Sequence, residues 1–471
     1  MTRYTFTITE AKYEALKMLL LRDQNEYGAL LLCGRSRHRD PWTGEVEERV
    51  LVQEVVEVDP QSFLTRTPAS MEWRTDDLYQ LAKRAMARDQ AICVIHSHPG
   101  GSTIFSTKDD VADRESMDII FGRMESVRPH YTAVMDSAGD LAVRAFGPDQ
   151  NQPPTPVEFI RVLGNRFRFF YHGYHVGSTP EEFDRHARAF GAAAVHDFSR
   201  LRIGIVGSGG TGSAVAMLLG RLGAVRIVLI DPDWVDLTNL NRLHFSNRAD
   251  AIQQRLKVDV IRDALADIGL VRSVIGLAKQ ADDPEAIEAL LSCDLIFGCT
   301  DDHLGRNLLN RISRFYLIPV IDLGVLIEPK EHGGYDSCDG RVTVVFPGSP
   351  CQHCRQLISR NRMLEESMAR TNPAQLEAYR RAGYVVGGLE PNPIVVTFTT
   401  ETATMAVTEL LHRLTGFRGT NGHCDERVRR FDGIKDADVV PGGRSRPDCP
   451  LCGTRKYDGR GDMIPLLDLA S

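Results

Sequence analysis

The chain has 471 residues, of which 42% are hydrophobic and 25% charged, and its formal net charge is −7. This length exceeds a single ordinary core and indicates about two or three domains, whereas the acidic balance argues against a broad surface for nucleic acid. The apolar runs are too short to span a membrane, and the first residues lack the apolar core of a signal peptide. We therefore expect a cytoplasmic protein with no nucleic-acid or membrane partner.

Residues 1–148 have the pattern of one α/β domain. Apolar positions recur with helical or strand periodicity, and turn-forming residues separate the segments. Pro, Gly and Gln residues then mark a boundary, so we expect a linker over residues 149–179. The predicted elements are a helix at 10–21, strands at 29–32 and 51–58, a helix at 76–88, a strand at 91–95 and a hairpin over 131–146.

The strongest chemical signal in this domain follows the strand at 91–95. His96 and His98 come directly after it, and with Asp109 they can fill three positions of a tetrahedral zinc site, leaving the fourth for water. Ser106 is a candidate donor to a developing oxyanion, and Glu26, ahead of an apolar strand, is the candidate general acid and base. Alternatively, Ser106 and Asp109 form only a helix-capping box, and the histidines are structural.

Glu26, the His96–His98 pair and the Ser106–Asp109 spacing together resemble the JAB/MPN (JAMM) zinc metallopeptidase family. The resemblance implies a catalytic zinc ion held by His96, His98 and Asp109. It also implies hydrolysis of a peptide or isopeptide bond that follows a ubiquitin-like protein, or trimming of a sulfur-carrier protein.

Residues 180–471 alternate strand and helix patterns. Such alternation is typical of a doubly wound parallel sheet, so we expect a second, Rossmann-like α/β domain. The predicted elements are helices at 181–193, 211–222, 254–268, 304–314 and 400–414, and strands at 202–206, 226–230, 295–298 and 319–323.

A glycine-rich turn follows the strand at 202–206, and its glycines are Gly207, Gly209, Gly210 and Gly212. Backbone N–H groups at such a helix N-terminus bind phosphates. Asp231, at the end of the next strand, is placed to bind a ribose. These features alone fit an NAD-dependent oxidoreductase as well as an adenylating enzyme.

The residues that follow favour the adenylating enzyme. Asp231, Asn239, Arg242, Lys257 and Asp301 come in an order that resembles the ThiF/MoeB and ubiquitin-activating superfamily. The resemblance implies ATP and Mg²⁺, and attack of a C-terminal glycine carboxylate on the α-phosphate. It assigns phosphates to Arg242 and Lys257, the nucleotide to Asn239, the ribose to Asp231 and Mg²⁺ to Asp301. For each basic residue alone, a solvated surface charge is the commoner role.

Upstream of this domain's first strand, Arg185 followed by Phe190-Gly191 resembles the family element that reaches into the neighbouring subunit's site. His186 departs from the Gln that is usual there, and Arg188 is a competing choice. The resemblance implies that Arg185 acts in trans within a homodimer.

Four cysteines form two C-x-x-C pairs, Cys351 with Cys354 and Cys449 with Cys452. Four thiolates give a closed tetrahedral zinc site, which we interpret as structural. A redox pair is the alternative, but the adenylating family carries a zinc site of this layout.

The crossover segment at 355–390 contains no cysteine, although the family usually places its transfer thiol there. Gly387–Pro391 occupies the region where that thiol is often found. Cys338 and Cys424 remain as candidate nucleophiles, and both can equally be ordinary loop residues. Whether a thioester, an oxyester or no covalent intermediate forms stays open.

The preferred interpretation is an enzyme that adenylates the C-terminal glycine of a ubiquitin-like protein and also processes or deconjugates it with a zinc peptidase. A bacterial conjugation or antiphage pathway is the expected setting, with a conjugating enzyme as a further partner. One alternative is activation and maturation of a sulfur-carrier protein for biosynthesis. Another is a non-catalytic scaffold that binds a ubiquitin-like tail, against which the intact candidate residues argue.

Overall fold

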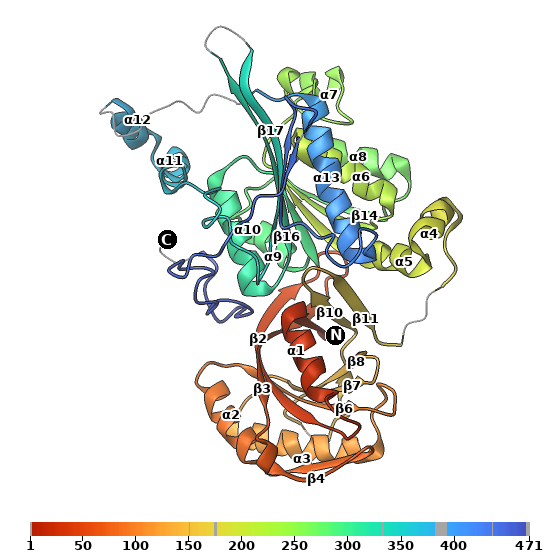
Figure 1. Ribbon diagram of the computed structural model, residues 1–471. Helices are drawn as coiled ribbons and strands as arrows, with labels where there is room; N and C mark the ends of the chain where they lie inside the picture. Colours follow the sequence, from red (N-terminus) through yellow and green to blue (C-terminus); the bar gives the residue numbers. More distant parts are fainter. Residues whose placement is uncertain are drawn as a thin grey trace. The chain divides into compact units, whose positions relative to one another are not determined.

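The computed structural model describes residues 2–149, 151–173, 177–330, 334–381, 393–435 and 437–467. Both halves of the chain are α/β, and each contains one large sheet, as the sequence predicts (Figure 1). Two compact units result. The first contains Met1–His175, Phe315–Leu317 and Tyr457–Ser471, and the second contains Val176–Arg314 and Ile318–Lys456.

The first unit is built on a sheet with the strand order β11-β10-β1-β3-β2-β6-β7-β8-β9. β1 is parallel to β3 and β10, and β6 is parallel to β7, whereas β2 is antiparallel to both neighbours. The strands are β1 (Thr2–Thr9), β2 (Gly28–Arg39), β3 (Val46–Glu57), β6 (Ala91–His98), β7 (His130–Asp136), β8 (Leu141–Phe146), β9 (Thr155–Pro156), β10 (Phe159–Leu163) and β11 (Phe167–Tyr171); β4 (Phe63–Thr67) and β5 (Ser70–Trp73) form a separate hairpin after the 3-10 turn η1 (Pro60–Ser62).

Helices cover both faces of this sheet (Figure 1). α1 (Glu10–Leu20) buries Tyr13, Leu16 and Leu20, which recur with the three- and four-residue spacing of an amphipathic helix. α2 (Asp76–Met86) and α3 (Thr107–Met124) cover the opposite face and enclose a second hydrophobic cluster. The sheet therefore lies between two hydrophobic layers.

Residues 149–179, expected as a linker, contribute three strands to the first unit, β9, β10 and β11. β10 and β11 form an antiparallel hairpin, and β10 pairs with β1 along five residues. Phe159, Ile160 and Val162 are buried, so the hairpin supplies part of the core. The first unit therefore extends beyond the boundary expected at residue 148.

The segment after Tyr457 also belongs to the first unit. Gly461 forms an isolated parallel bridge with Arg35 on β2, and the Asp462 N–H donates to the Arg35 carbonyl at 2.8 Å. A Cβ on Gly34 would lie 2.0 Å from the Gly459 carbonyl oxygen, so this close approach requires glycine. The domain assignment predicted from the sequence placed this segment in the second domain.

The second unit is built on a sheet with the order β14-β13-β12-β15-β16-β17-β18-β19. The strands from β14 to β16 are parallel, as the doubly wound pattern predicts, and the last three extend the sheet in antiparallel fashion. The strands are β12 (Arg202–Val206), β13 (Arg226–Ile230), β14 (Ser273–Leu277), β15 (Leu295–Gly298), β16 (Val320–Pro329), β17 (Tyr335–Val345), β18 (Glu426–Arg430) and β19 (Asp438–Val439).

Two helices of this unit have boundaries that differ from the predicted ones, and the backbone angles explain both differences. The helix expected at 181–193 is divided because Gly191, with φ of 88°, separates α4 (Asp184–Phe190) from α5 (Ala192–Arg200). The helix expected from residue 254 begins later because Gln254 has φ of 49°. The other helical segments are η2 (Glu181–Phe183), α6 (Gly210–Leu222), η3 (Leu237–Asn239), α7 (Arg248–Ile252), α8 (Lys257–Ile268), α9 (Pro284–Leu291), α10 (His303–Tyr316), α11 (Arg360–Thr371), α12 (Pro373–Arg381) and α13 (Val396–Thr415).

Among the described residues, no helix combines the length and the apolar content that a membrane span requires.

Candidate active sites

The carboxyl end of β6 and the first turn of α3 bring the predicted zinc ligands together. His96 and His98 are two residues apart on β6, so their side chains leave the same face of the strand. Their Nε2 atoms are 3.0 Å apart, and the Asp109 carboxylate lies 3.2 Å from His96 Nε2 and 3.4 Å from His98 Nε2. His98 Nδ1 lies 2.9 Å from the Ser102 carbonyl oxygen, a contact that orients the ring.

This donor set fits a zinc ion. Donor atoms about 2.0–2.1 Å from a tetrahedral metal lie about 3.3 Å from one another, close to the separations among these three side chains. His96, His98 and Asp109 form one of the two groups of potential ligands found among the described residues. Two imidazoles and one carboxylate leave a fourth position for water, as hydrolysis requires.

Glu26 lies next to this triad. It precedes β2, and Gly28 of β2 pairs with His96 of β6. The Glu26 side chain is 8% exposed and lines a cavity of about 240 Å³ together with His96 and Asp109. Burial raises the pKa of Glu26, and the nearby His96 and His98 act in the opposite direction. A raised pKa suits a carboxylate that accepts and returns a proton near neutral pH.

Ser106 caps α3, as the alternative interpretation of the sequence expected. Its Oγ accepts the Asp109 N–H at 3.2 Å, and its own N–H donates to the Asp109 carboxylate at 2.5 Å. The capping box therefore positions Asp109, the predicted third ligand. Because Oγ is an acceptor in this contact, the contact does not use the hydroxyl proton.

One wall of this cavity was not predicted by any motif in the sequence. Met71 and Trp73, from the β4–β5 hairpin, line it together with Ala112 and Ile119 of α3. Apolar side chains beside a hydrolytic triad provide a surface for a substrate chain. Their position depends on the hairpin's folding, which no local motif marks.

The predicted nucleotide loop lies where β12 has β13 on one side and β15 on the other. Ligands of open α/β sheets bind at such a topological switch point. Gly207 has φ of 90°, and a Cβ on Gly212 would lie 1.9 Å from the Gly207 carbonyl oxygen, so both positions require glycine. A Cβ on Gly209 would meet no atom within 4 Å. Gly207, Gly209 and Gly210 line a cavity of about 360 Å³ at the start of α6.

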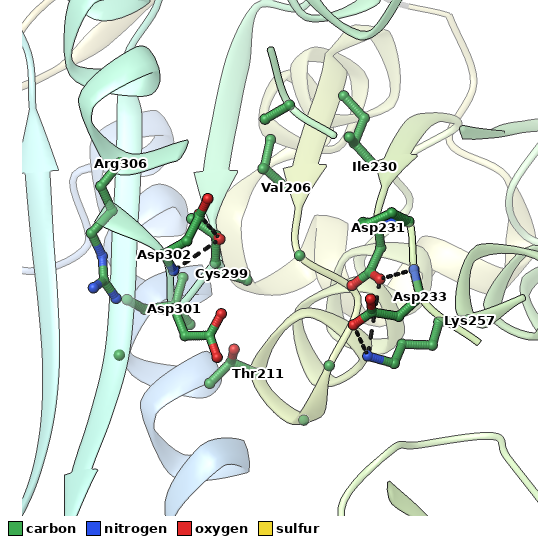
Figure 2. A pocket seen from close by; sticks show the side chains of 18 of the residues that line it. Val206, Thr211, Ile230, Asp231, Asp233, Lys257, Cys299, Asp301, Asp302 and Arg306 are labelled. Carbon is green, nitrogen blue, oxygen red and sulfur yellow. Dashed lines mark hydrogen bonds and ion pairs between the residues drawn. The ribbon is translucent and has the colours of Figure 1, made fainter. Parts of the chain in front are cut away.

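One side of this cavity carries the predicted ribose and phosphate residues (Figure 2). Asp231 is buried and accepts the Ser208 N–H at 2.6 Å and the Asp233 N–H at 2.9 Å. Burial raises the pKa of Asp231, and the charge of Lys257 opposes this shift. Lys257 Nζ lies 2.7 Å from the Asp233 carboxylate and 4.0 Å from Asp231.

The other side of the cavity carries Asp301, Asp302 and Arg306 (Figure 2). Arg306 Nε lies 3.3 Å from the buried carboxylate of Asp322. Arg370, from the crossover helix α11, lies with Nη2 2.8 Å from Asp302 and also lines the cavity. Sequence analysis missed Arg306 and Arg370. The position of Arg306 one helical turn beyond Asp302 was a usable signal, whereas Arg370 reaches the cavity only through the fold of the crossover segment.

The remaining predicted nucleotide residues differ in their placement. Arg242 lines the cavity, and its Nη1 donates to the Thr238 carbonyl at 2.6 Å. Asn239 instead caps η3, where its side chain accepts the Asp236 N–H at 3.3 Å. Arg185 is exposed on α4. Within the described part of this chain, the residues that line the cavity include neither Asn239 nor Arg185.

The two C-x-x-C pairs meet in the second unit. Cys351 Sγ lies 3.5 Å from Cys449 Sγ, and Cys354 Sγ lies 3.4 Å from Cys452 Sγ. All four sulfur atoms are within 4.8 Å of one another. Sulfur atoms about 2.3 Å from a tetrahedral zinc ion are about 3.8 Å apart, so the four thiols fit this metal.

Of the two candidate nucleophiles outside the crossover segment, Cys338 is buried and Cys424 is half-buried. Cys338 lies on β17 and is 1% exposed, and burial raises the pKa of its thiol. Cys424 Sγ donates to the Glu426 carbonyl at 2.9 Å, and burial again raises its pKa. Neither thiol is set up as a thiolate. The Gly387–Pro391 stretch lies outside the described residues.

Models of known protein families match both halves of the chain. The model of the ThiF family matches residues 183–451, and the model of prokaryotic homologs of the JAB domain matches residues 12–146. The SAMP-activating enzyme E1 of Haloferax volcanii is 23% identical over 56% of this chain and 84% of that protein. The sulfur carrier protein ThiS adenylyltransferase of Bacillus subtilis is 25% identical over 54% of this chain and 65% of that protein.

Among solved structures, Escherichia coli MccB with ATP matches with a TM-score of 0.44 and 19% identity, over 58% of this chain and 75% of that chain. The ThiF match covers more than half of the chain, and the JAB match covers the residues that carry the histidine triad. The chain belongs to the ThiF family and carries a JAB domain ahead of its ThiF region.

Proposed function

We propose that the second unit uses ATP and Mg²⁺ to adenylate the C-terminal glycine of a ubiquitin-like or sulfur-carrier protein. The observation that carries this proposal is the cavity at the end of β12, where a glycine loop, five cationic side chains and several carboxylates converge. The names of the relatives, an activating enzyme E1 and an adenylyltransferase, support it.

In this reaction a carboxylate oxygen attacks the α-phosphorus, the bond to the bridging oxygen breaks, and pyrophosphate leaves. Positioning and charge neutralisation carry most of such a reaction. The glycine-loop amides, Arg242 and Lys257 would hold the phosphates, Asp231 would accept hydrogen bonds from the ribose, and Asp301 would hold Mg²⁺, which offsets phosphate charge. Arg185 would enter from a second copy of the chain, which makes the proposed enzyme a homodimer.

ATP–pyrophosphate exchange with candidate carrier proteins tests this proposal. Asp301→Ala should reduce exchange by about a hundredfold, the loss typical of a group that acts on transition-state charge. Asp267→Ala removes an exposed carboxylate from α8 and should leave exchange unchanged. Absence of exchange with every carrier, together with tight NAD binding, would contradict adenylation and favour an oxidoreductase.

The first unit is proposed to be a zinc peptidase that matures or deconjugates the same carrier. A zinc ion held by His96, His98 and Asp109 would lower the pKa of a bound water to near neutrality. Glu26 would take the proton of that water and return it to the leaving amine, and the Ser106 hydroxyl would donate to the oxyanion. The buried position of Glu26 beside the triad supports this role.

Cleavage of a carrier extended beyond its terminal glycine tests the peptidase. Glu26→Gln keeps the side-chain shape but removes the base, so cleavage should fall by at least about a hundredfold while the zinc content measured by mass spectrometry stays the same. Glu14→Gln, on the exposed face of α1, is the control. Unchanged cleavage by Glu26→Gln would remove Glu26 from this role.

The second candidate function is activation of a sulfur carrier for biosynthesis, which the name of the Bacillus subtilis relative favours. The two functions differ in what becomes of the adenylated glycine. Mass spectrometry of the carrier after reaction in cell extract would show a thiocarboxylate in the sulfur pathway and an isopeptide bond to a target in the conjugation pathway.

A further inference from the structure

We propose that the first unit carries a second ligand site, distinct from the histidine triad, which binds a phosphate group in a cavity formed by four arginines. Arg35, Arg88, Arg128 and Arg460 line this arginine cavity, whose volume is about 310 Å³. This inference is independent of the proposed enzymatic activities.

The four arginines come from separated parts of the sequence. Arg35 lies on β2, Arg88 follows α2, Arg128 precedes β7, and Arg460 lies in the segment that docks along β2. All four belong to the first unit. Since the cavity depends on the docked segment, it is a product of the tertiary fold and not of a local basic run.

Arg35 gives an independent indication of a ligand. It is 2% exposed, and its Nη1 donates to Glu48 at 3.0 Å and to the Pro129 carbonyl at 2.6 Å. Its Nε and Nη2 are buried and have no hydrogen-bond partner in the described part of the chain. Buried donors without acceptors are unfavourable, and such groups commonly mark a missing ligand or water.

The charges around the cavity favour an anion. Arg128 lies 3.1 Å from Asp89, which is one of the two carboxylates in the lining, with Asp462. Asp462 also accepts the Arg37 N–H at 2.7 Å. Burial lowers the pKa of Arg460, and the neighbouring charge of Arg88 lowers it further. Two guanidinium groups that repel each other would both be stabilised by an anion placed between them.

Among anions, phosphate fits this arrangement best. Arginines reach the cavity from several directions, and guanidinium groups donate in a planar fork that matches phosphate oxygens. A phosphate has enough oxygens to accept from more than one arginine, and its charge balances the excess of arginines over carboxylates in the lining. Inorganic phosphate and the phosphate of a nucleotide share this chemistry.

Titration calorimetry of the full chain with inorganic phosphate and, separately, with AMP tests the site. Arg88→Ala and the double variant Arg88→Ala/Arg460→Ala should weaken phosphate binding by about tenfold or more, as the loss of a charge-assisted contact predicts. Arg84→Ala, on the exposed side of α2, is the matched control, because Arg84 pairs with Glu54 outside the cavity. ATP–pyrophosphate exchange should be the same in all three variants.

Each outcome is decisive. Loss of phosphate binding in Arg88→Ala but not in Arg84→Ala supports the site, and a similar loss for AMP identifies a nucleotide phosphate as a ligand. Arg88 is exposed, so its replacement should leave the fold intact, which circular dichroism checks. Absence of phosphate binding to the wild-type chain, or equal binding by the wild type and both cavity variants, would overturn the proposal, whatever the exchange assay shows.

Discussion

Three basic residues that line the nucleotide cavity each form an ion pair with a carboxylate of the protein. Lys257 contacts Asp233, Arg306 contacts Asp322, and Arg370 contacts Asp302. A polyphosphate entering the cavity would compete for these cations. Its binding therefore exchanges ion pairs, and the affinity depends on how readily each pair opens.

Arg370 is the residue for which this exchange is easiest to measure. Arg370→Ala should raise the KM for ATP by about tenfold in pyrophosphate exchange, a change expected for one charge-assisted contact. The KM for the carrier protein should change less. Arg381→Ala, on α12, is the control because Arg381 pairs with Glu377 within its own helix. An equal KM for ATP in wild type and Arg370→Ala would show that Arg370 makes no contact with the nucleotide.

At the residue scale, the structure brings predicted site residues together where they are close in the sequence. His96, His98 and Asp109 converge because a strand end and a capped helix fix their directions within a short stretch. Arg370 was not predicted because its place in the cavity lining depends on how the long crossover segment folds back. Asn239 shows the opposite limit, since its side chain is engaged in a local cap.

At the scale of elements, the turn between β12 and α6 contains two glycines, Gly209 and Gly212, that differ in the space around them. Gly212 touches the Gly207 carbonyl, whereas Gly209 faces open space within the cavity. Packing therefore requires glycine at position 212, and at position 209 the proposed nucleotide, rather than packing, would require it.

We expect Gly212→Ala to destabilise the second unit by about 2–4 kcal/mol, because the added methyl group has no room beside the backbone. Gly209→Ala should keep the stability of the protein but weaken ATP binding, because its methyl group would occupy the cavity. Urea unfolding and ATP titration of both variants measure these effects. Equal stability of the two variants would contradict the separation.

A second element-scale feature is the buried carboxylate that links three strands of the first sheet. Glu47 on β3 accepts from Thr5 on β1 at 2.8 Å and lies 3.2 Å from Arg49 and 3.5 Å from Arg161 on β10. The Glu47 side chain is completely buried. Its removal would leave arginines buried without this carboxylate.

Glu47→Ala should therefore lower the free energy of unfolding of the first unit by about 3–5 kcal/mol, the usual effect of removing one partner of a buried pair. Glu45→Ala, at an exposed position before β3, should change it by less than about 0.5 kcal/mol. Urea unfolding followed by tryptophan fluorescence compares the two. A small effect of Glu47→Ala would mean that water or a neighbouring carboxylate takes its place.

The strand cores were predictable because apolar runs bounded by turn residues leave little choice. The helix breaks and the additional strands of the first sheet were not predictable in this way. Gly191 and Gln254 end or delay helices through positive φ angles that composition does not reveal. β10 joins the first sheet because β1 offers it a pairing edge, a property of the tertiary fold.

At the scale of the whole molecule, stability should depend on pH through a buried histidine. His130 on β7 is fully buried, and its Nδ1 accepts the Ile92 N–H at 3.1 Å. Burial, with a further contribution from Arg35, lowers the pKa of His130 to about 3. The folded state therefore keeps His130 neutral at pH values where the unfolded chain is protonated.

Between about pH 6.5 and pH 3 the unfolded state binds the extra proton, so stability falls as the pH is lowered. The expected loss is about 1.4 kcal/mol for each pH unit in this window, and none above it. His130→Asn retains an acceptor and should remove this part of the pH dependence. Urea unfolding at pH 7 and pH 5 compares the variant with the wild type; parallel losses in the two proteins would exclude His130 as the cause.

The docking of residues 457–467 along β2 has a consequence for biosynthesis. A ribosome that has completed residues 1–175 has not yet made the segment whose Gly461 bridges to Arg35. The second unit must therefore be translated before the C-terminal segment of the first unit, Tyr457–Ser471, has been made. During synthesis the nascent histidine triad therefore belongs to an unfinished domain, and its maturation is timed by translation of the ThiF region.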